Sequence, residues 1–253
     1  MRVVGIIPAR FESSRFEGKA LAKIGGKSII RRVYEQAKKA RILSEVIVAT
    51  DDERIKKEVE EFKGKVVLTS PSHPTGTDRL ADVAKEIEGE LVVNIQGDQP
   101  FIEPVMIEEA VEPLIKDPTI VMGTIMQRMT LDKDLSNPNI VKVVADQSGF
   151  ALYFSRSLIP YPRNGKDFPV YKHIGLYAYR KDFLLKLSSL PPTPLEERES
   201  LEQLRALDYG YKIKVVKTRV KYSALGGLSI NTKEDLKEAE ERLIKKEKDE
   251  KMG

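Results

Sequence analysis

Cysteine is absent from the 253 residues of the chain, and histidine occurs only twice. The missing cysteine excludes a disulfide framework, a thiolate nucleophile and a cysteine metal site, and it is natural for a reducing compartment. Long apolar runs are missing as well, since none approaches the roughly 20 residues that a membrane-spanning helix needs. The chain begins with a strand-like segment that has no signal-peptide pattern. We therefore expect a cytoplasmic protein without a membrane partner.

A large excess of one charge is also absent, because 43 basic residues stand against 39 acidic ones and the formal net charge is +4. A balance this close does not argue for nucleic acid or an anionic membrane surface as a partner. The charges of the C-terminal stretch 233–253 alternate in sign at helical spacing. This pattern predicts a solvated helix.

Short apolar runs alternate with segments of helical periodicity through the first hundred residues. Strands are predicted at 2–9, 45–52, 65–69 and 90–102, and helices at 28–43, 53–62 and 78–89. This alternation is the sequence form of an α/β fold, with a parallel sheet and helices on both of its faces. We find no internal repeat and no long low-complexity linker, so we expect a single domain, 1–253.

The alternation of predicted strands and helices changes after about residue 120. Apolar β-type segments at 140–146, 150–156 and 173–180 are interrupted by proline-containing stretches, including 157–171. We predict a β-rich sub-region at about 120–185 within the single domain. A helix at 195–210, a strand at 211–218 and the C-terminal helix then complete the chain.

Polar residues follow each of the four predicted N-terminal strands. They are Arg10, then Thr50, Asp51 and Asp52, then Thr69 and Ser70, then Gln96, Gly97 and Asp98. Ligands of open α/β sheets bind outside the carboxyl ends of the strands. We therefore expect these four strand ends to converge on one crevice.

The first strand leads into a basic segment, IIPARFESSRFEGK, which carries Arg10, Arg15 and Lys19 together with Ser13 and Ser14. A nucleoside triphosphate needs positive charge at its phosphates and hydroxyl or backbone donors around them. The spacing matches neither the P-loop nor the dinucleotide-binding glycine pattern. A solvated basic loop without a ligand therefore stays an alternative from these residues alone.

Asp98 follows another predicted strand and is preceded by Gly97, which permits close approach of the backbone. A carboxylate at this place can hold Mg²⁺ against triphosphate oxygens. By itself such a residue is more often an acidic turn residue or helix cap. The basic loop and the acidic strand end together favour a nucleotide site.

Several segments, in order, resemble the nucleotidyltransferases that activate acidic sugars with CTP, above all the 3-deoxy-manno-octulosonate (Kdo) cytidylyltransferase family, or CMP-Kdo synthetases. The matching segments are IIPARFESSRFEGKAL, IVATDDERI, HPTGTDRLADVA, VVNIQGDQPFI, NPNIVKVV, FALYFSRSLIP, KHIGLYAYR and PLEERESLEQLRALDYG. The resemblance implies a Rossmann-like, mostly parallel sheet flanked by helices, with a β-rich region for dimerisation and substrate binding. It also implies that a homodimer converts CTP and Kdo to CMP-Kdo and pyrophosphate for lipopolysaccharide synthesis, with Mg²⁺ as cofactor.

The resemblance assigns roles by position. It makes Arg10, Lys19 and Asp98 the catalytic residues, which neutralise charge as the anomeric 2-hydroxyl of the sugar attacks the α-phosphate without a covalent intermediate. The nucleotide-binding residues that it implies are Pro8, Ala9, Arg10, Ser14, Arg15, Lys19, Gly76, Thr77, Arg79, Gln96, Gly97 and Asp98. We expect Arg79 to contact the base or the ribose.

The sugar acid requires a cation for its carboxylate and hydrogen-bonding groups for its hydroxyls. The resemblance implies that these are Arg156, His173, Tyr177, Glu202 and Gln203. Without that context, a lone histidine in an apolar strand such as 173–180 is usually a satisfied core residue. Tyr177 and Tyr179 can each also be core or interface residues, with Tyr177 the better candidate for a sugar contact.

The metal ligands that the resemblance implies are Asp98 and the residue at position 231. Relatives carry glycine, valine, aspartate and threonine before the last helix, whereas this chain has Ser229, Ile230, Asn231 and Thr232. Asparagine can coordinate through its carbonyl oxygen but brings no charge. We expect a second metal to be held more weakly here, or mostly by phosphate and substrate.

Two other functions remain open at this point. The first is a cytidylyltransferase for another acidic sugar such as sialic acid. The second is a non-catalytic regulator that binds a nucleotide through the same fold. The joint presence of Arg10, Lys19 and Asp98 argues against the regulator, because a protein that only binds nucleotide does not need all three.

Overall fold

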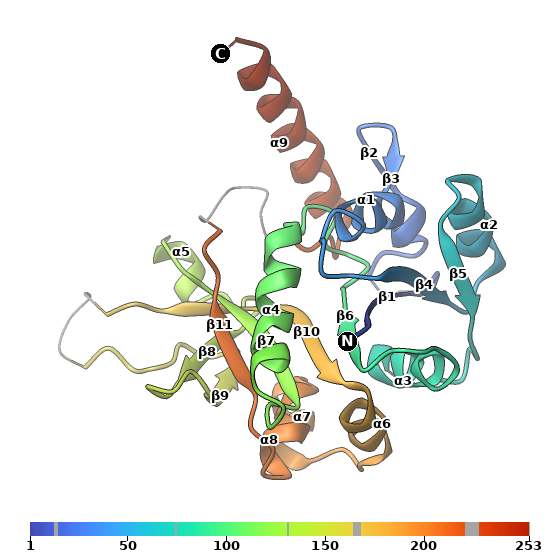
Figure 1. The fold of residues 1–253 in the computed structure, drawn as a ribbon. Coiled ribbons are helices and arrows are strands. Elements are labelled where there is room, and N and C mark those ends of the chain that lie inside the picture. The colour runs from blue at the N-terminus through green and yellow to red at the C-terminus, as the bar shows by residue number, and fades with distance from the viewer. Residues whose placement is uncertain (13–14, 74, 131, 164–167, 221–227, 253) are drawn as a thin grey trace.

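One mixed sheet organises the molecule in the computed structural model, which describes residues 1–12, 15–73, 75–130, 132–163, 168–220 and 228–252. Within these residues nine strands form the sheet, in the order β11-β7-β10-β6-β1-β4-β5, with β8 and β9 extending it from β10 (Figure 1). The strands are β1 (Val3–Ala9), β4 (Glu45–Thr50), β5 (Lys65–Leu68), β6 (Leu91–Asn94), β7 (Met122–Arg128), β8 (Lys142–Ala145), β9 (Ala151–Ser155), β10 (Tyr171–Arg180) and β11 (Lys214–Lys217). A two-stranded ribbon of β2 (Lys23–Ile24) and β3 (Lys27–Ser28) lies apart from this sheet.

Helices connect the strands and cover the sheet. They are α1 (Ile29–Ala37), α2 (Glu53–Glu61), α3 (Gly76–Glu86), α4 (Pro104–Lys116), α5 (Asp132–Leu135), α6 (Lys181–Ser189), α7 (Pro194–Glu199), α8 (Gln203–Asp208) and α9 (Lys233–Met252), with a 3₁₀ turn η1 (Lys19–Leu21). No helix of the described residues is both long and apolar enough to cross a membrane.

The N-terminal half of the sheet is parallel, as the alternation of strands and helices predicts. β1 pairs in parallel with β4 on one side and with β6 on the other, and β4 pairs in parallel with β5. The strand order therefore reverses direction between β1 and β6. Such a reversal leaves a crevice at the carboxyl ends of the two strands, where the connecting segments diverge to opposite faces of the sheet.

The β-rich region extends this sheet instead of forming a layer of its own. β10 runs antiparallel to both β6 and β7, and β11 runs parallel to β7. β8 and β9 form an antiparallel pair that joins the sheet where Lys142 pairs with Lys172 of β10. Two strands of the predicted region, β7 and β10, thus belong to the centre of the sheet.

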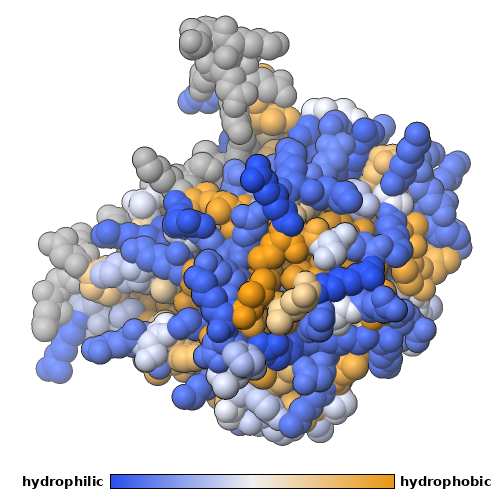
Figure 2. All heavy atoms as spheres, viewed as in Figure 1, coloured by the Kyte–Doolittle hydropathy of each residue, from blue (hydrophilic) through white to orange (hydrophobic). Residues whose placement is uncertain are grey.

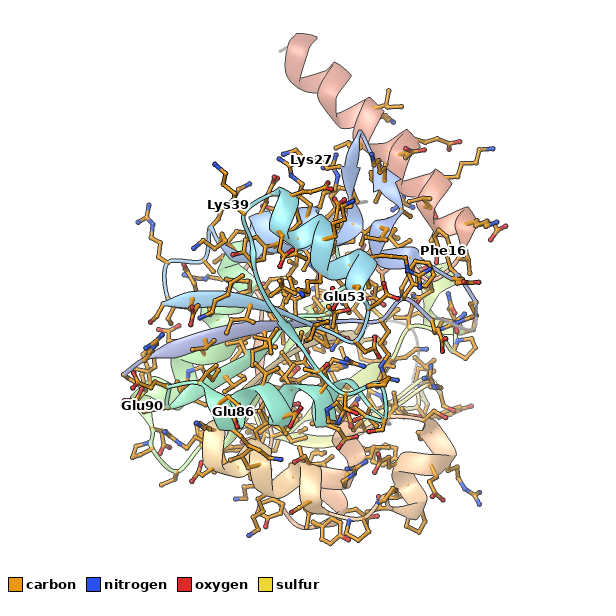
Figure 3. The ribbon with its side chains drawn as sticks, turned by 90° about the vertical axis from the view of Figure 1, so that its right-hand side faces the viewer. Phe16, Lys27, Lys39, Glu53, Glu86 and Glu90 are labelled. Carbon is orange, nitrogen blue, oxygen red and sulfur yellow. The ribbon has the colours of Figure 1, made fainter. Side chains whose placement is uncertain are left out.

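Two hydrophobic cores lie on the two faces of the sheet. One contains the buried faces of α1, α2 and α4, and the other contains those of α3, α6 and α8. Glu53 on α2 and Glu86 on α3 are seen on opposite sides of the strands in Figure 3. Phe16, which follows β1, and Glu90, which precedes β6, mark opposite ends of the strands in the same view. The helices on both faces follow from the period of their apolar residues.

The surface in Figure 2 is mostly hydrophilic, and apolar residues gather near the middle of this face, around α4. Helix α9 projects from the body of the molecule (Figure 1). Its beginning packs on the first core through Leu236, Ala239 and Leu243. The charged residues Glu240, Glu241 and Lys245 that follow are exposed, as predicted for a solvated helix.

Three local predictions were wrong or incomplete. The helix predicted at 195–210 is broken, because Ser200 adopts a left-handed conformation with φ of 50° between α7 and α8. The strand predicted at 90–102 ends at Asn94, and the next residues form turns that carry Asp98. Helix α4 was not predicted, and Pro113 in its interior is a residue that argues against a helix in sequence reasoning.

Candidate functional site

A cleft of about 290 Å³ opens at the carboxyl ends of β1 and β6, where the strand order reverses. It is lined by Pro8, Ala9, Arg10, Glu12, Lys19, Ala20, Gln96, Gly97 and Asp98. Seven of these nine residues are predicted nucleotide-binding residues. The volume is at the lower end of the range for small-molecule sites.

Gly97 allows the two sides of the cleft to meet. A Cβ atom at this position would lie 2.6 Å from the carbonyl oxygen of Pro8, which is closer than any side chain tolerates. Glycine is therefore required for the backbone after β6 to approach the end of β1. This approach places Asp98 at the mouth of the cleft.

Lys19 and Asp98 face each other across the cleft. Lys19 Nζ donates to Asp98 Oδ2 at 2.9 Å, and the side chains are 18% and 24% exposed. Lys19 begins the turn η1 after Gly18, whose φ is 68° and whose N–H donates to the carbonyl oxygen of Phe11. The basic segment thus folds back on itself and returns its last lysine to the strand end from which it started.

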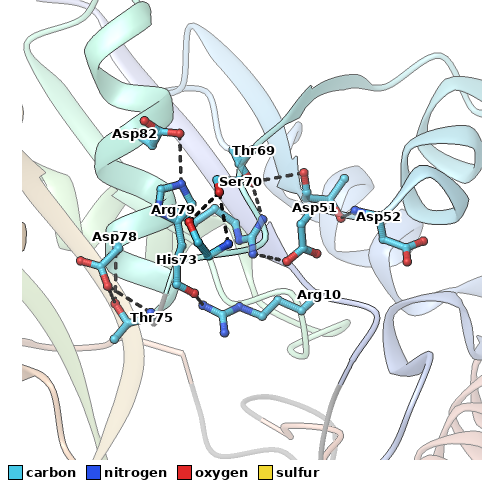
Figure 4. A network of polar contacts seen from close by, with 12 residues as sticks. Arg10, Asp51, Asp52, Thr69, Ser70, His73, Thr75, Asp78, Arg79 and Asp82 are labelled. Atoms are coloured by element: carbon cyan, nitrogen blue, oxygen red, sulfur yellow. Dashed lines mark hydrogen bonds and ion pairs between the residues drawn. The ribbon is translucent and has the colours of Figure 1, made fainter.

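Arg10 joins β1 to the segment that precedes α3. Its guanidinium donates to the carbonyl oxygen of His73 at 2.8 Å, and the imidazole of His73 lies 3.1 Å from Asp82 Oδ2 (Figure 4). Arg10 also lines the cleft. Arg15 is exposed and is not one of the lining residues, and Ser14 lies outside the described residues.

Arg79, predicted to contact the base or the ribose, is not among the residues that line the cleft. Its side chain is fully buried, with one nitrogen 2.5 Å from Asp51 Oδ2 and another donating to the hydroxyl of Thr69 (Figure 4). A guanidinium in this position ties α3 to the ends of β4 and β5. In this conformation it can act on a ligand only by holding the surrounding segments in place.

The prediction that four strand ends converge is therefore only half right. The ends of β1 and β6 line the cleft, whereas Asp51 and Thr69 at the ends of β4 and β5 are used by Arg79. Asp52 caps α2 by accepting from the backbone N–H of Arg54 and also pairs with the guanidinium of that residue. The sequence predicted the correct edge of the sheet for Asp51 and Asp52. Both carboxylates, however, pair with arginines of the protein, Arg79 and Arg54, outside the cleft.

The first turn of α3 approaches the cleft through Gly76 and not through the side chain of Thr77. A Cβ atom on Gly76 would be 3.7 Å from the Pro8 ring, so the backbone of the helix N-terminus approaches β1 closely. Thr75 caps the helix in a reciprocal capping box with Asp78. Thr77 is 2% exposed and donates its hydroxyl to Glu202 Oε2 at 2.5 Å. Thr77, predicted to bind the nucleotide, thus uses its hydroxyl on Glu202 and is not among the residues that line the cleft.

The predicted sugar-binding residues gather on the same face of the sheet as α3. The ring centroid of His173 on β10 lies 5.3 Å from that of Tyr177, and Tyr177 stacks on Tyr179 with 5.9 Å between ring centroids. Burial raises the pKa of Tyr177 and of Tyr179, and the Glu202 carboxylate raises both further. The two phenols are therefore neutral hydroxyl groups beside a carboxylate.

His173 is partly buried and is uncharged near neutral pH, because desolvation of its ring lowers its pKa to about 3. Its Nε2 lies 3.0 Å from the hydroxyl of Thr124, which donates to the carbonyl oxygen of Leu176 at 2.8 Å. A hydroxyl has a single proton to donate, so it accepts from Nε2–H of the imidazole. This arrangement leaves Nδ1 as a hydrogen-bond acceptor.

Glu202 and Gln203 stand at the beginning of α8, next to the break at Ser200. Glu202 Oε1 and Gln203 Nε2 are buried atoms that have no hydrogen-bond partner among the described residues. Burial raises the pKa of the Glu202 carboxyl, and the hydrogen bond from Thr77 partly offsets this effect. An unpaired acceptor and an unpaired donor on consecutive residues suit a ligand rich in hydroxyl groups.

Arg156, at the end of β9, is held by the backbone. It donates to the carbonyl oxygens of Glu199 at 2.6 Å, Pro138 at 3.0 Å and Ser200 at 3.3 Å. The structure therefore brings Arg156 to the α7–α8 junction, two residues before Glu202. Its guanidinium braces this junction as well as supplying a positive charge near it.

The comparisons with known proteins agree with this geometry. The family model described as cytidylyltransferase matches residues 4–213. The 3-deoxy-manno-octulosonate cytidylyltransferase of Geotalea uraniireducens (strain Rf4) is 50% identical over 256 residues, covering 97% of this chain and 100% of that protein. The protein of the same name from Geobacter sulfurreducens is 50% identical over 254 residues, covering 96% of this chain and 100% of its own. The chain belongs to the 3-deoxy-manno-octulosonate cytidylyltransferase family.

A solved structure supports the same family. It is described as CMP:2-keto-3-deoxy-manno-octonic acid synthetase complexed with CTP, and it matches with a TM-score of 0.91 and 38% identity. The match covers 97% of this chain and 100% of that chain. The Rossmann-like α/β fold implied by the sequence resemblance is thus confirmed.

Position 231, where this chain carries asparagine, lies beside Asp98. The backbone N–H of Ile230 donates to the carbonyl oxygen of Asp98 at 2.9 Å, and Asn231 is the next residue in the chain. Asp235 accepts from the backbone N–H groups of Asn231 and Thr232 at 2.7 and 2.9 Å and holds the turn that precedes α9. The two predicted metal ligands are therefore brought to one place by a contact between distant parts of the chain.

A divalent cation fits this arrangement only with help from a substrate. No cluster of three or more histidine, cysteine, aspartate or glutamate side chains that could hold a metal occurs in the described part of the chain. Asp98 offers a carboxylate that is partly exposed at the cleft, and Asn231 offers a neutral amide oxygen. Phosphate oxygens are the ligands that complete such sites for Mg²⁺.

Sequence reasoning missed Glu12 and Ala20, which line the cleft. Both lie inside or directly after the basic segment, so that segment was the available signal for them. It also missed Asp51 and Thr69 as partners of Arg79. No local pattern connects these three residues, because their contacts join separate strand ends to a helix.

Proposed function

We propose that this chain transfers CMP from CTP to Kdo, giving CMP-Kdo and pyrophosphate for lipopolysaccharide synthesis. The observation that carries the proposal is the ion pair of Lys19 and Asp98 at the cleft between β1 and β6. It presents a cation for the phosphates and a carboxylate for a metal at the place where α/β folds bind nucleotides. The family relatives that bear this activity in their names match nearly the full length of the chain.

In the proposed reaction, the anomeric 2-hydroxyl of Kdo attacks the α-phosphate of CTP in line and pyrophosphate leaves. Lys19 and Arg10 neutralise charge on the phosphates, and Gln96 and Gly97 offer hydrogen-bonding groups at the opposite wall of the cleft. Lys19 reaches the phosphates by leaving Asp98. The chain has no cysteine, and the mechanism needs no covalent intermediate.

The proposed cofactor is Mg²⁺, which would be held by Asp98 and, through its amide oxygen, by Asn231. When bound, it would supply charge stabilisation to the α-phosphate as negative charge develops in the transition state. Asp98 is oriented for this role by the close approach of Gly97 to Pro8. Asn231 is oriented by the hydrogen bond from Ile230 N–H to the Asp98 carbonyl oxygen.

The proposed sugar site is the cluster around His173, Tyr177, Glu202 and Gln203. The unpaired Glu202 Oε1 would accept from a sugar hydroxyl, and the unpaired Gln203 Nε2 would donate to one. The Nδ1 atom of His173 is a further acceptor. Arg156 supplies positive charge for the carboxylate of the sugar acid.

We further propose a cytoplasmic homodimer that pairs through the β-rich region. Leu152 on β9 and Tyr161 in the segment that follows are 63% and 83% exposed. Apolar side chains that gather into an exposed patch mark protein interfaces, and a partner subunit packed on this region would bury both residues. Light scattering at micromolar protein concentration is expected to give twice the mass of the chain. The mass of a monomer would refute the proposed dimer.

The deciding experiment is a pyrophosphate-release assay with each of four nucleoside triphosphates and with Kdo, sialic acid and a neutral sugar. We expect release only with CTP and Kdo in the presence of Mg²⁺. Release with sialic acid instead of Kdo would establish the alternative cytidylyltransferase. CTP binding without release with any acid would establish a nucleotide-binding regulator.

A further inference from the structure

The first turn of α3 touches both proposed substrate sites through consecutive residues. Gly76 packs its backbone against Pro8, which lines the nucleotide cleft. Thr77, the next residue, donates its hydroxyl to Glu202 Oε2 at 2.5 Å. Residues 77 and 202 are far apart in the chain, and this bond spans the boundary between the two sites.

Thr77 is well placed to control the geometry of Glu202. Its side chain is almost completely buried, at 2% exposure, and a short hydrogen bond from a neutral donor to a carboxylate is directional. The bond occupies Oε2 and leaves Oε1 without a partner. The Thr77 bond, together with a second hydroxyl contact from Thr75, therefore sets where the free oxygen points.

We propose that Thr77 is a positioning residue that couples the two substrate sites, by orienting Glu202 toward the sugar acid from a helix turn that packs on the nucleotide cleft. This inference rests on the proposed function, because it assumes that Glu202 contacts the sugar. Nucleotide binding against the α3 N-terminus then steadies the turn that holds Glu202. By linkage, each substrate strengthens the binding of the other.

The charged surroundings of Glu202 give a second observable. Asp78 on α3 and the phenols Tyr177 and Tyr179 on β10 lie close to it, and Arg205 on α8 is the nearby cation. Burial raises the pKa of Glu202, Asp78 raises it further, and Arg205 lowers it. Hydrogen bonds from Thr77 and, to a smaller extent, from Thr75 also lower the pKa, because they stabilise the ionised form.

The test uses Thr77→Val, which keeps the shape of the side chain and removes the hydroxyl, and Thr77→Ser, which keeps the hydroxyl. Thr119→Val is the matched control, because the Thr119 hydroxyl also donates to a carboxylate, Asp117 Oδ1 at 2.7 Å. Thr119 is exposed in the segment that enters β7, at the opposite end of the sheet from the cleft. The substrate in all of these assays is the sugar acid that the wild-type enzyme turns over best.

For Thr77→Val we expect the KM of the sugar acid to rise about tenfold, the scale of losing a hydrogen bond to a charged group. The Kd of CTP measured by calorimetry without sugar should stay within about twofold of wild type. The increase in sugar affinity that CTP produces in wild type should be lost. Thr77→Ser should restore both properties, and Thr119→Val should leave them unchanged.

The pH profile separates positioning from general damage to the fold. In Thr77→Val the acid limb of kcat/KM for the sugar acid should move to higher pH, because Glu202 loses a bond that favours its ionised form. Thr77→Ser should return the limb to its wild-type position. A variant that is merely less stable would lose activity without moving the limb.

Three results would overturn the inference. They are wild-type kinetics for Thr77→Val, equal losses of CTP and sugar binding in that variant, and a failure of Thr77→Ser to restore sugar binding. A wild-type enzyme that turns over no sugar acid overturns both the proposed function and this inference. An active wild type with an indistinguishable Thr77→Val variant overturns the inference alone.

Discussion

Lys19 Nζ and Asp98 Oδ2 form an ion pair at 2.9 Å across the cleft between β1 and β6. The proposed phosphate-binding cation and the proposed metal-binding carboxylate therefore neutralise each other in the free protein. The pair is partly exposed, so it is worth little in stability and can be broken by a ligand. A nucleotide with its metal would offer each partner a more highly charged group.

Replacing Lys19 should expose this competition. In Lys19→Met the carboxylate of Asp98 loses its ion-pair partner. The free protein should then bind Mn²⁺ about tenfold more tightly, because the positive charge of Lys19 no longer repels the metal ion. Electron paramagnetic resonance of Mn²⁺ without nucleotide measures this directly. CTP affinity should fall in the same variant, because a phosphate contact is lost.

The matched control for that experiment is Lys23→Met, which removes the same charge from an exposed position in β2. Its Mn²⁺ affinity should equal that of wild type. Equal Mn²⁺ affinity for Lys19→Met and Lys23→Met would mean that Lys19 does not compete with the metal for Asp98.

Asp98→Asn should affect catalysis more than nucleotide binding. The substitution keeps the shape of the side chain and removes its charge, and we expect kcat to fall by about two orders of magnitude or more. Steady-state kinetics at saturating Mg²⁺ and calorimetric titration with CTP provide the comparison. Normal turnover of this variant, with a stability loss of only about 1 kcal/mol, would show that Asp98 is a turn residue.

Asn231→Asp tests the neighbouring position. The backbone contact of Ile230 with Asp98 brings residue 231 to the proposed metal site, and a carboxylate there adds the charge that asparagine lacks. The Mg²⁺ concentration for half-maximal rate should therefore decrease. An unchanged Mg²⁺ requirement would indicate that residue 231 is not a ligand.

His173 should make the stability of the protein depend on pH. Its pKa is about 3 in the folded protein, against an ordinary value near 6.5, so the unfolded chain binds more protons between these values. The free energy of unfolding should therefore fall by about 1.4 kcal/mol for each pH unit below about 6.5, and nothing is lost above it. Urea unfolding of wild type and His173→Gln at pH 7, 6 and 5 measures the effect. The variant should lack this part of the slope, and parallel slopes would show that the imidazole is not buried in neutral form.

The sequence by itself determined the layered part of this architecture. The spacing of apolar residues predicts a parallel sheet with helices on both faces, because strands and helices bury their side chains with different periods. The carboxyl ends of parallel strands lie at one edge of the sheet, which is why Arg10, Lys19 and Asp98 were predicted to serve one site and do line one cleft. The family resemblance of consecutive segments pointed to the same residues.

The tertiary structure decided what each polar side chain touches. Arg79 and Thr77 were predicted to bind the nucleotide, yet the buried Arg79 contacts Asp51 and Thr69, and the buried Thr77 contacts Glu202. The break at Ser200 and the approach of Ile230 to Asp98 were equally invisible in the local pattern. Each of these contacts joins residues that are distant in the chain. Local periodicity reports which face of an element is buried, but the partner on that face exists only after the sheet and its helices have assembled.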